Sequence, residues 1–163
     1  MRTLLIVFHS ATGGTRQMAE ASAAGASREP GVRTRLLRAD QAGAQDVLDA
    51  DGYLFATPEN LAAMAGVMKD FFDRTYYAAL ERVNGRPYAA LICAGNDGQN
   101  AARQIARIAT GWRLRAVAEP IIVHTHAQTP EAIRARKTIA PRELERCAEA
   151  GNALAAGLAL GVF

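Results

Sequence analysis

The sequence has few cysteines, few aromatic residues and little net charge. Its 163 residues include 2 cysteines, Cys93 and Cys147, which do not form a Cys-x-x-Cys pair. A disulfide framework is therefore not expected. A chain of this length can be held together by its hydrophobic core, so we expect both thiols to be buried and reduced, as is usual in the cytoplasm.

No strong excess of charge marks the chain as a nucleic-acid binder. The formal net charge is +3, from 19 basic and 16 acidic residues. The densest basic stretch runs from Arg134 through Lys137 to Arg146 and contains no aromatic residue on which bases could stack. We interpret these charges as solvated loop and helix faces and expect no nucleic-acid partner.

The sequence also lacks a long hydrophobic run. Residues 4–8 are too few for a signal peptide, and the apolar residues 153–163 are far short of a membrane span. We therefore expect a cytoplasmic protein without a targeting segment. The apolar carboxyl end favours a homodimer or higher homo-oligomer through Leu158, Leu160, Val162 and Phe163.

What the chain does contain is an alternation of strand-like and helix-like segments. Strands are predicted at residues 4–8, 32–37, 52–57, 88–94 and 114–123, the last bent or interrupted at Pro120. Helices are predicted at residues 15–27, 64–77, 100–112 and from Pro141 onward. This alternation predicts a single α/β domain over residues 1–163, a doubly wound parallel sheet with helices on both faces.

Ligands of such sheets bind beyond the carboxyl ends of the strands, which directs attention to three loops. The first follows Phe8 and combines hydroxyl side chains with glycines at the start of a helix. Helix N-termini present free N–H groups and a positive dipole end, so this loop predicts a phosphate site. An ordinary polar turn with a helix cap is the alternative. The loop is His9, Ser10, Ala11, Thr12, Gly13, Gly14 and Thr15.

The first loop excludes several other phosphate-handling proteins. It lacks the lysine and the spacing of a Walker A motif, so nucleotide triphosphate hydrolysis is not expected. It also lacks the acidic residues of a phospho-aspartate receiver domain and the cysteine of a cysteine-dependent phosphatase.

Residues 6–19 resemble the flavodoxin family signature, with Ser10, Gly13, Thr15 and Ala19 at the family's spacings. The sequence departs from that signature at Ser22, where an aliphatic residue is usual. The resemblance implies a flavodoxin-like sheet of strand order 2-1-3-4-5 and a loop that wraps the phosphate of FMN. It assigns that role to Ser10, Ala11, Thr12, Gly13, Gly14 and Thr15.

The second loop, residues 57–66, leads into a Lys-x-Phe-x-Asp-Arg helix and is similar to the corresponding stretch of NAD(P)H-dependent FMN reductases and quinone reductases. That resemblance implies that Pro58, Glu59, Asn60 and Leu61 run along the flavin ring. The third loop would face the polar edge of the flavin with Gly95, Asn96, Asp97 and Gly98. Ordinary connecting turns and helix caps are the alternatives for both loops.

Neither the second nor the third loop contains Trp, Tyr or Phe. Low-potential carriers of this family commonly enclose the flavin between aromatic rings and are strongly acidic, and this chain has neither feature. The resemblance therefore favours an NAD(P)H-dependent reductase that passes hydride through FMN to a small-molecule acceptor such as a quinone or a flavin. A flavodoxin-type electron carrier and a non-catalytic binding module with the same fold remain as alternatives.

No side chain is predicted to act as a catalytic acid or base. His9, His124 and His126 follow strands at the ligand edge, where they could contact phosphate, flavin or acceptor, although surface loop histidine is the simpler interpretation. His124 and His126 have no carboxylate or cysteine nearby in the sequence, so no metal site is expected.

Overall fold

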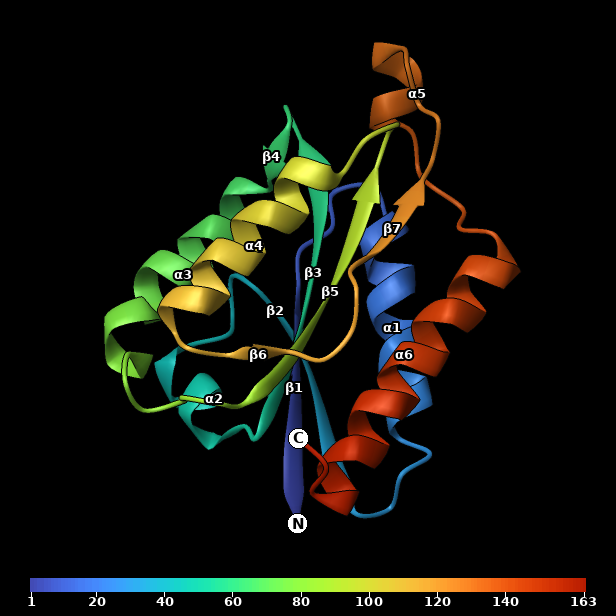
Figure 1. Cartoon of the computed structure of the whole chain (residues 1–163). Coiled ribbons are helices and arrows are strands. Elements are labelled where there is room, and N and C mark those ends of the chain that lie inside the picture. The colour runs from blue at the N-terminus through green and yellow to red at the C-terminus, as the bar shows by residue number, and fades with distance from the viewer.

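The computed structural model describes all residues 1–163 and places a parallel sheet between two layers of helices (Figure 1). The strands are β1 (Arg2–Phe8), β2 (Val32–Arg38), β3 (Gly52–Asn60), β4 (Ala63–Met64), β5 (Pro87–Ala94), β6 (Arg115–Ala116) and β7 (Ile121–His124). The helices are α1 (Gly14–Ala26), α2 (Ala44–Asp49), α3 (Gly66–Ala79), α4 (Gln99–Gly111), α5 (Pro130–Arg134) and α6 (Pro141–Leu160).

The strand order confirms the predicted flavodoxin-like class. The sheet runs β2-β1-β3-β5-β6, β7 also pairs with β5, and all of these pairs are parallel. The predicted fourth strand is β5 and the predicted fifth is divided into β6 and β7, so the chain follows the path 2-1-3-4-5. The short β4 lies off this path and pairs antiparallel with β3.

The sequence pattern failed for short elements. Helices α2 and α5 and strand β4 were not predicted, because each is too short to show a hydrophobic period. The last strand, by contrast, is interrupted at residues 117–120 as predicted, and Pro120, in this gap, has no N–H to donate to a neighbouring strand.

Each face of the sheet has its own core. Helices α3 and α4 cover one face with large aromatic side chains, among them the fully buried Phe71, Phe72 and Trp112. Helices α1 and α6 cover the other face with smaller side chains, and the free cysteines Cys93 and Cys147 are buried there as predicted (Figure 1). The central strand β1 is buried from Leu4 to Phe8, which explains its continuous apolar sequence.

Helices α1 and α6 pack closely enough for backbone to meet backbone. A Cβ atom on Gly25 would overlap the carbonyl oxygen of Ala148, and one on Gly151 would overlap that of Ser22. The Ser22 hydroxyl donates a 2.8 Å hydrogen bond to the carbonyl oxygen of Cys147. Ser22 therefore replaces the aliphatic residue of the family signature with a polar link between the two helices.

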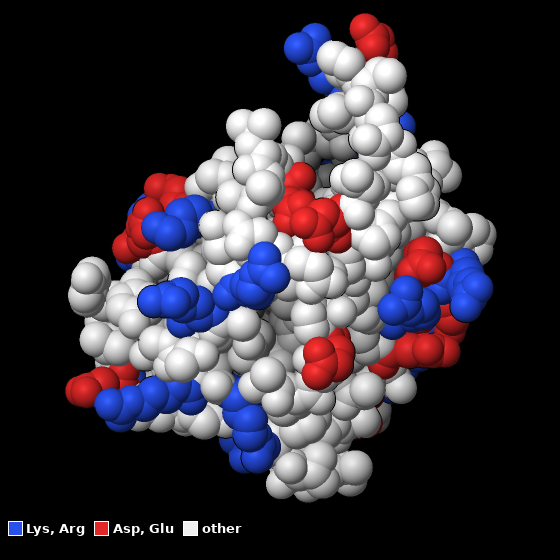
Figure 2. All heavy atoms as spheres, turned by 45° about the horizontal axis from the view of Figure 1, so that its top comes forward, with Lys and Arg blue, Asp and Glu red and all other residues white.

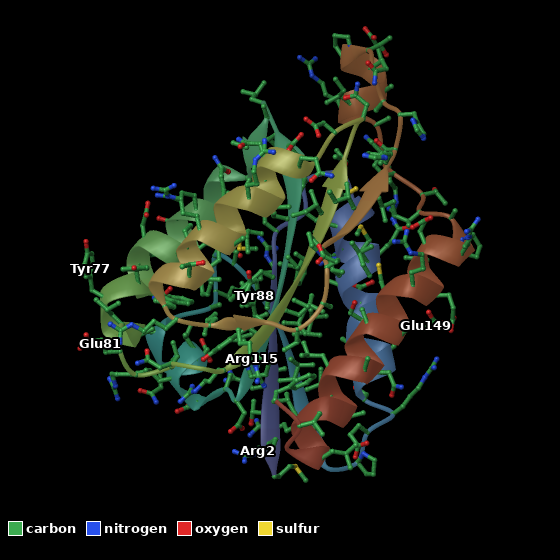
Figure 3. The ribbon with its side chains drawn as sticks, viewed as in Figure 1. Arg2, Tyr77, Glu81, Tyr88, Arg115 and Glu149 are labelled. Carbon is green, nitrogen blue, oxygen red and sulfur yellow. The ribbon has the colours of Figure 1, made fainter.

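The surface carries charges of both signs. Two ion pairs form along α3, with 2.6 Å between Lys69 and Asp73 and 2.7 Å between Arg74 and Asp70. Basic and acidic side chains are interspersed on the face seen in Figure 2, and Tyr77 points away from the outer side of α3 in Figure 3. None of the helices combines the length and apolar character that a membrane crossing requires.

Candidate functional site

A cavity of about 570 Å³ lies at the carboxyl edge of the sheet, within the usual size range of small-molecule sites. The strand register brings the ends of β1, β3 and β5 together there, with Phe8 opposite Ala56 and Pro58 opposite Cys93. We call this cavity the edge pocket. Its lining residues are Ser10, Ala11, Thr12, Gly14, Thr15, Pro58, Glu59, Asn60, Leu61, Ala62, Cys93, Ala94, Gly95, Asn96, Thr125, Ala127, Gln128, Ile133, Arg134 and Lys137.

The three loops singled out in the sequence meet in the edge pocket. Of the fourteen predicted cofactor-binding residues, all but Gly13, Asp97 and Gly98 line it. Gly13 lies on the other side of the first loop, Asp97 is exposed, and the N–H of Gly98 is already hydrogen-bonded within the protein.

The first loop has a fixed shape. The Ser10 hydroxyl oxygen accepts a 3.1 Å hydrogen bond from the N–H of Gly13. Gly13 has a φ of 92°, a left-handed conformation that favours glycine, and it precedes the first residue of α1. The loop therefore turns into the helix without any side chain at the tightest point.

Most N–H groups of this loop have no partner in the protein. No hydrogen bond is made by the N–H groups of Ser10, Ala11, Thr12, Gly14, Thr15 and Arg16. All of these residues except Arg16 line the edge pocket. Unpaired donors at a helix N-terminus form a site for an anion, which supports the phosphate prediction.

A distant segment is fastened to the same loop. The Gln17 amide group donates to the carbonyl oxygens of Gly13 (2.9 Å) and Lys137 (2.8 Å) and accepts from the N–H of Ile139 (3.0 Å). The N–H of Lys137 donates to the carbonyl oxygen of Thr12 at 2.8 Å. Gln17 thereby ties residues 137–139, 120 positions or more away, to the first loop.

The floor of the edge pocket is tightly packed under Gly14. A Cβ atom on Gly14 would lie 2.7 Å from the Cys93 sulfur, so only glycine fits without movement. Burial raises the pKa of the Cys93 thiol, while the charge of Lys137 and a hydrogen bond with Thr15 oppose that rise. Cys93 is therefore a protonated packing residue at neutral pH.

The second loop is a hairpin whose two turn residues, Leu61 and Ala62, have φ values of 49° and 61°. Helix α4 braces this hairpin by hydrogen bonds from Asn100 to the Ala62 carbonyl oxygen (2.5 Å) and from the Met64 N–H to Gln104 (2.8 Å). The fully exposed Leu61 side chain is thus held at the rim of the edge pocket.

Glu59 joins the second loop to the third. Its carboxylate accepts hydrogen bonds from the N–H groups of Gly98 (2.9 Å) and Ala101 (3.1 Å), both at the start of α4. A carboxylate in this position satisfies two free donors and complements the positive end of the helix. The structure therefore gives Glu59 and Gly98 a role in holding the two loops together.

A fourth wall of the edge pocket was missed in the sequence. Thr125, Ala127, Gln128, Ile133, Arg134 and Lys137 all come from the segment after β7. The signal that could have found them is that a fifth parallel strand ends at the same edge. The Lys137 ammonium donates to the carbonyl oxygens of Ala132, Ile133 and Ala135, so it also closes the end of α5.

The three histidines lie outside the edge pocket. The Nε2 atom of His124 is 2.8 Å from the carbonyl oxygen of Asp97, and the rings of His124 and His126 are 6.1 Å apart. His9 lines a second cavity on the other side of the first loop. No group of three or more His, Cys, Asp or Glu side chains in the structure could hold a metal ion.

Comparison with known proteins places the fold in the flavodoxin-like class. The solved structure of a flavodoxin from the domain Archaea matches with a TM-score of 0.77 at 18% identity, covering 96% of this chain and 98% of that chain. At this identity the likeness shows the fold alone.

Sequence comparison gives the family. A family model described as NADPH-dependent FMN reductase matches residues 39–128, more than half of the chain. The chain therefore belongs to this family of FMN-dependent oxidoreductases. The match begins after the first loop, so the phosphate-site prediction is supported by the geometry of that loop rather than by the family match.

Two curated relatives agree with this family. A flavodoxin from Aquifex aeolicus (strain VF5) is 34% identical over 98 residues, which cover 60% of this chain and 53% of that protein. An NAD(P)H dehydrogenase (quinone) from Acidithiobacillus ferrooxidans (strain ATCC 53993 / BNL-5-31) is 32% identical over 95 residues, covering 46% of this chain and 48% of that protein. The chain matches about half the length of each of these relatives.

The edge pocket fits the chemistry of FMN. The free N–H groups of the first loop suit a phosphate, and the second and third loops form two walls of a pocket that continues from them. None of the ten aromatic side chains of the chain lines the pocket. A flat ring bound there would have no aromatic side chain stacked on it.

Proposed function

We propose that the protein holds FMN in the edge pocket and transfers hydride from NAD(P)H through FMN to a small-molecule acceptor such as a quinone or a flavin. Bound FMN supplies the redox chemistry. The unpaired N–H groups of the first loop carry this proposal, since so many free donors together at a helix N-terminus favour an anion.

The chain's own residues bind and orient the cofactor. The N–H groups of Ala11, Thr12 and Gly14 would donate to the phosphate, and Thr12 adds a hydroxyl group. The hairpin at Leu61, braced by α4, would keep the ring in one plane at the strand ends. We assign no side chain a proton-transfer role.

A flavodoxin-type electron carrier is the second candidate, favoured by the partial match to the Aquifex aeolicus flavodoxin. The pocket lining favours the reductase over the carrier. With no aromatic side chain in the edge pocket, one face of the bound ring is left accessible to a nicotinamide and then to an acceptor.

Binding can be tested with a pair of variants at Ser10. Ser10→Asp keeps an oxygen that can accept from the Gly13 N–H but adds a negative charge beside the phosphate, whereas Ser10→Asn keeps an acceptor without the charge. We expect FMN to bind Ser10→Asp at least about tenfold more weakly than Ser10→Asn, measured by quenching of flavin fluorescence. Equal affinities, or no saturable quenching in the native protein, would overturn the proposed phosphate site.

Turnover separates the two redox functions. FMN-loaded protein is mixed with NADH or NADPH and a quinone, and oxidation of the nicotinamide is followed by absorbance. Steady oxidation supports the reductase. Negligible turnover with both nucleotides, in protein that binds FMN, leaves the electron carrier.

We also infer a cytoplasmic homo-oligomer. The two free thiols suit a reducing compartment, and Leu160 and Val162 remain exposed at the carboxyl end, whereas Leu158 is buried within the chain. Light scattering should give a mass of at least twice 17.4 kDa at micromolar concentration. A mass of 17.4 kDa would contradict the oligomer.

A further inference from the structure

Two exposed apolar side chains lie at the rim of the edge pocket. Seven large hydrophobic side chains of the chain are exposed, and two of them, Leu61 and Ile133, line this cavity. Leu61 lies on the hairpin between β3 and β4, and Ile133 lies on α5. Figure 1 shows the hairpin, at the left, and α5, at the right, both projecting beyond the carboxyl ends of the central strands. Scattered exposed apolar side chains are common, but two that converge on one cavity favour contact with a ligand.

Helix α5 is held by hydrogen bonds rather than by a hydrophobic core. None of its residues is buried. The Thr129 hydroxyl oxygen accepts from the N–H of Ala132 at 3.2 Å, and the Lys137 ammonium donates to three carbonyl oxygens at the other end of the helix. The N–H of Lys137 also donates to the Thr12 carbonyl oxygen at 2.8 Å. These bonds fix the position of Ile133, although its side chain is 54% exposed.

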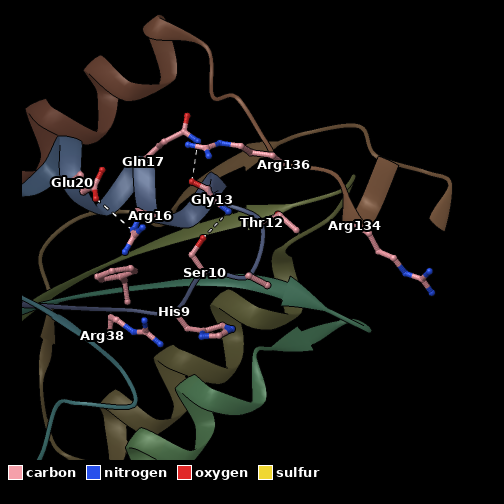
Figure 4. Close-up of a pocket in the computed structure, with 12 residues that line it drawn as sticks. His9, Ser10, Thr12, Gly13, Arg16, Gln17, Glu20, Arg38, Arg134 and Arg136 are labelled. Atoms are coloured by element: carbon pink, nitrogen blue, oxygen red, sulfur yellow. Dashed lines mark hydrogen bonds and ion pairs between the residues drawn. The ribbon is translucent and has the colours of Figure 1, made fainter. Parts of the chain in front are cut away.

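The chain that follows α5 runs along the first loop. Figure 4 shows Arg136 beside Gln17 and Gly13, and its Cγ atom lies 4.0 Å from the position of a Cβ atom on Gly13. Helix α5 is therefore attached to the loop that the proposed function assigns to the cofactor phosphate, and Ile133 is placed relative to that loop.

Little free charge faces Ile133. The three N–H donors of the Lys137 ammonium are all used at the end of α5. Arg134, the last residue of α5, points away from the first loop in Figure 4. The other lining residues from this segment are uncharged, namely Thr125, Ala127 and Gln128. Because burying a charge without a partner is costly, the space beside Ile133 favours an uncharged ligand surface.

We propose that Ile133 packs against the outer face of the ring that stacks on bound FMN, and that this contact selects a flat, uncharged acceptor. This inference rests on the proposed function and adds a specificity-determining residue to it. Leu61 and its hairpin contact one face of the flavin, and the acceptor ring lies between the other face and Ile133. No aromatic side chain lines the pocket, so an aliphatic side chain supplies the apolar contact.

The test measures electron transfer without a nicotinamide, so its result is independent of NAD(P)H oxidation. FMN-loaded protein is reduced photochemically in the absence of oxygen and mixed with 1,4-naphthoquinone or with ferricyanide. Reduced FMN passes two electrons and two protons to the naphthoquinone, or two electrons to two ferricyanide ions with release of two protons to water. Flavin absorbance follows the reoxidation, and its dependence on acceptor concentration gives the half-saturating concentration. Ferricyanide has no flat ring and needs no stacking contact.

The variants separate the apolar contact from the fold of α5. Ile133→Ala removes most of the side chain but keeps a residue that favours a helix, and Ile133→Leu restores an apolar side chain of the same size. Tyr77→Ala is the matched control, because Tyr77 is 83% exposed but lies on α3 and does not line the edge pocket.

We expect the half-saturating naphthoquinone concentration to rise at least about tenfold in Ile133→Ala and to stay within about twofold in Ile133→Leu and Tyr77→Ala. Ferricyanide reoxidation and the dissociation constant of FMN should change by less than about twofold in every variant. Equal naphthoquinone values in all proteins would overturn the proposal, as would an equal loss with ferricyanide.

The proposed function can fail separately. A native protein that binds no FMN overturns it. A native protein that binds FMN and shows the Ile133 effect, but oxidises neither NADH nor NADPH, supports the contact at Ile133 and contradicts the reductase.

Discussion

At the scale of single residues, the edge pocket depends on two small groups in contact, Gly14 at the start of α1 and Cys93 at the end of β5. Gly14 has no side chain, so the free N–H groups of the first loop remain accessible, and the Cys93 side chain fills the space beneath them. Their contact could not be seen in the sequence because 79 positions separate them, 93 − 14. A phosphate site at the first loop could be proposed from the sequence, since hydroxyl side chains and glycines at the start of a helix form a local pattern.

Gly14→Ala should weaken both folding and FMN binding. Its Cβ atom would lie 2.7 Å from the Cys93 sulfur, so the buried neighbours must shift, which typically costs about 1–3 kcal/mol. Urea unfolding measures the loss. Adding Cys93→Ala removes the sulfur, so the double variant should lose less stability than the sum of the two single changes. If the stability losses of the two single variants simply add in the double variant, the contact between the new Cβ atom and the Cys93 sulfur is not the cause of the loss.

The raised pKa of the second buried thiol, that of Cys147, predicts that the protein loses stability at alkaline pH. Burial raises the pKa of Cys147 from 9.0 to about 11, with a smaller contribution from Glu143. Between these pH values the folded chain keeps the proton and the unfolded chain releases it, so this stabilising contribution is complete below pH 9 and declines as pH rises toward 11.

Urea unfolding at a series of pH values measures this decline. The native protein should lose more unfolding free energy between pH 9 and 11 than Cys147→Ala does. The variant retains Cys93, Tyr53 and Tyr88, whose pKa values burial also raises, so the difference isolates Cys147. Identical slopes would contradict the assignment.

At the scale of elements, close contacts between helices and loops set the geometry of the ligand edge. Helix α4 braces the hairpin through Asn100 and Gln104 and receives the Glu59 carboxylate at its start. Helices α1 and α6 can pack closely because Gly25 and Gly151 lie where the two helices cross. These contacts join residues far apart in the chain, so the sequence pattern predicted the helices but not their partners.

Gly25→Ala should destabilise the α1–α6 crossing by about 3 kcal/mol, because its Cβ atom would overlap the Ala148 backbone, which cannot turn away like a side chain. Gly66→Ala is the matched control. No atom lies within 4 Å of a Cβ at Gly66, the first residue of α3, and alanine favours helix by up to about 1 kcal/mol. Thermal unfolding compares the two, and equal stability would disprove the backbone contact.

At the scale of the whole molecule, the sequence predicts the order of the strands. It predicts only part of the lining of the edge pocket. The buried runs at residues 4–8, 52–57 and 88–94 predicted the central strands because both faces of those strands are covered. The wall formed after β7 and the Glu59 cap were not predicted. Each depends on contacts between segments that are far apart in the chain and that the connections between parallel strands bring together. A local sequence pattern does not indicate such contacts.

Cofactor binding should stabilise the entire fold, because in the proposed complex the first loop and both neighbouring loops would contact one ligand. FMN at about 100 times its dissociation constant should add about 2.7 kcal/mol to the free energy of unfolding. The midpoint of thermal unfolding should therefore rise with FMN concentration in the native protein and in Ser10→Asn. At the same FMN concentration Ser10→Asp should show a smaller rise, and an equal rise would place the ligand elsewhere.

The single tryptophan, Trp112, is fully buried and lies against Phe72 and Tyr76, and its indole N–H donates to the Tyr76 carbonyl oxygen at 3.0 Å. Its ultraviolet emission overlaps the absorption of oxidised flavin, and the small size of the molecule would keep a flavin in the edge pocket within energy-transfer range. The native chain thus carries its own optical reporter. Flavin loading should dim the indole emission and unfolding should shift it to the red, so the two events can be told apart without attaching a dye.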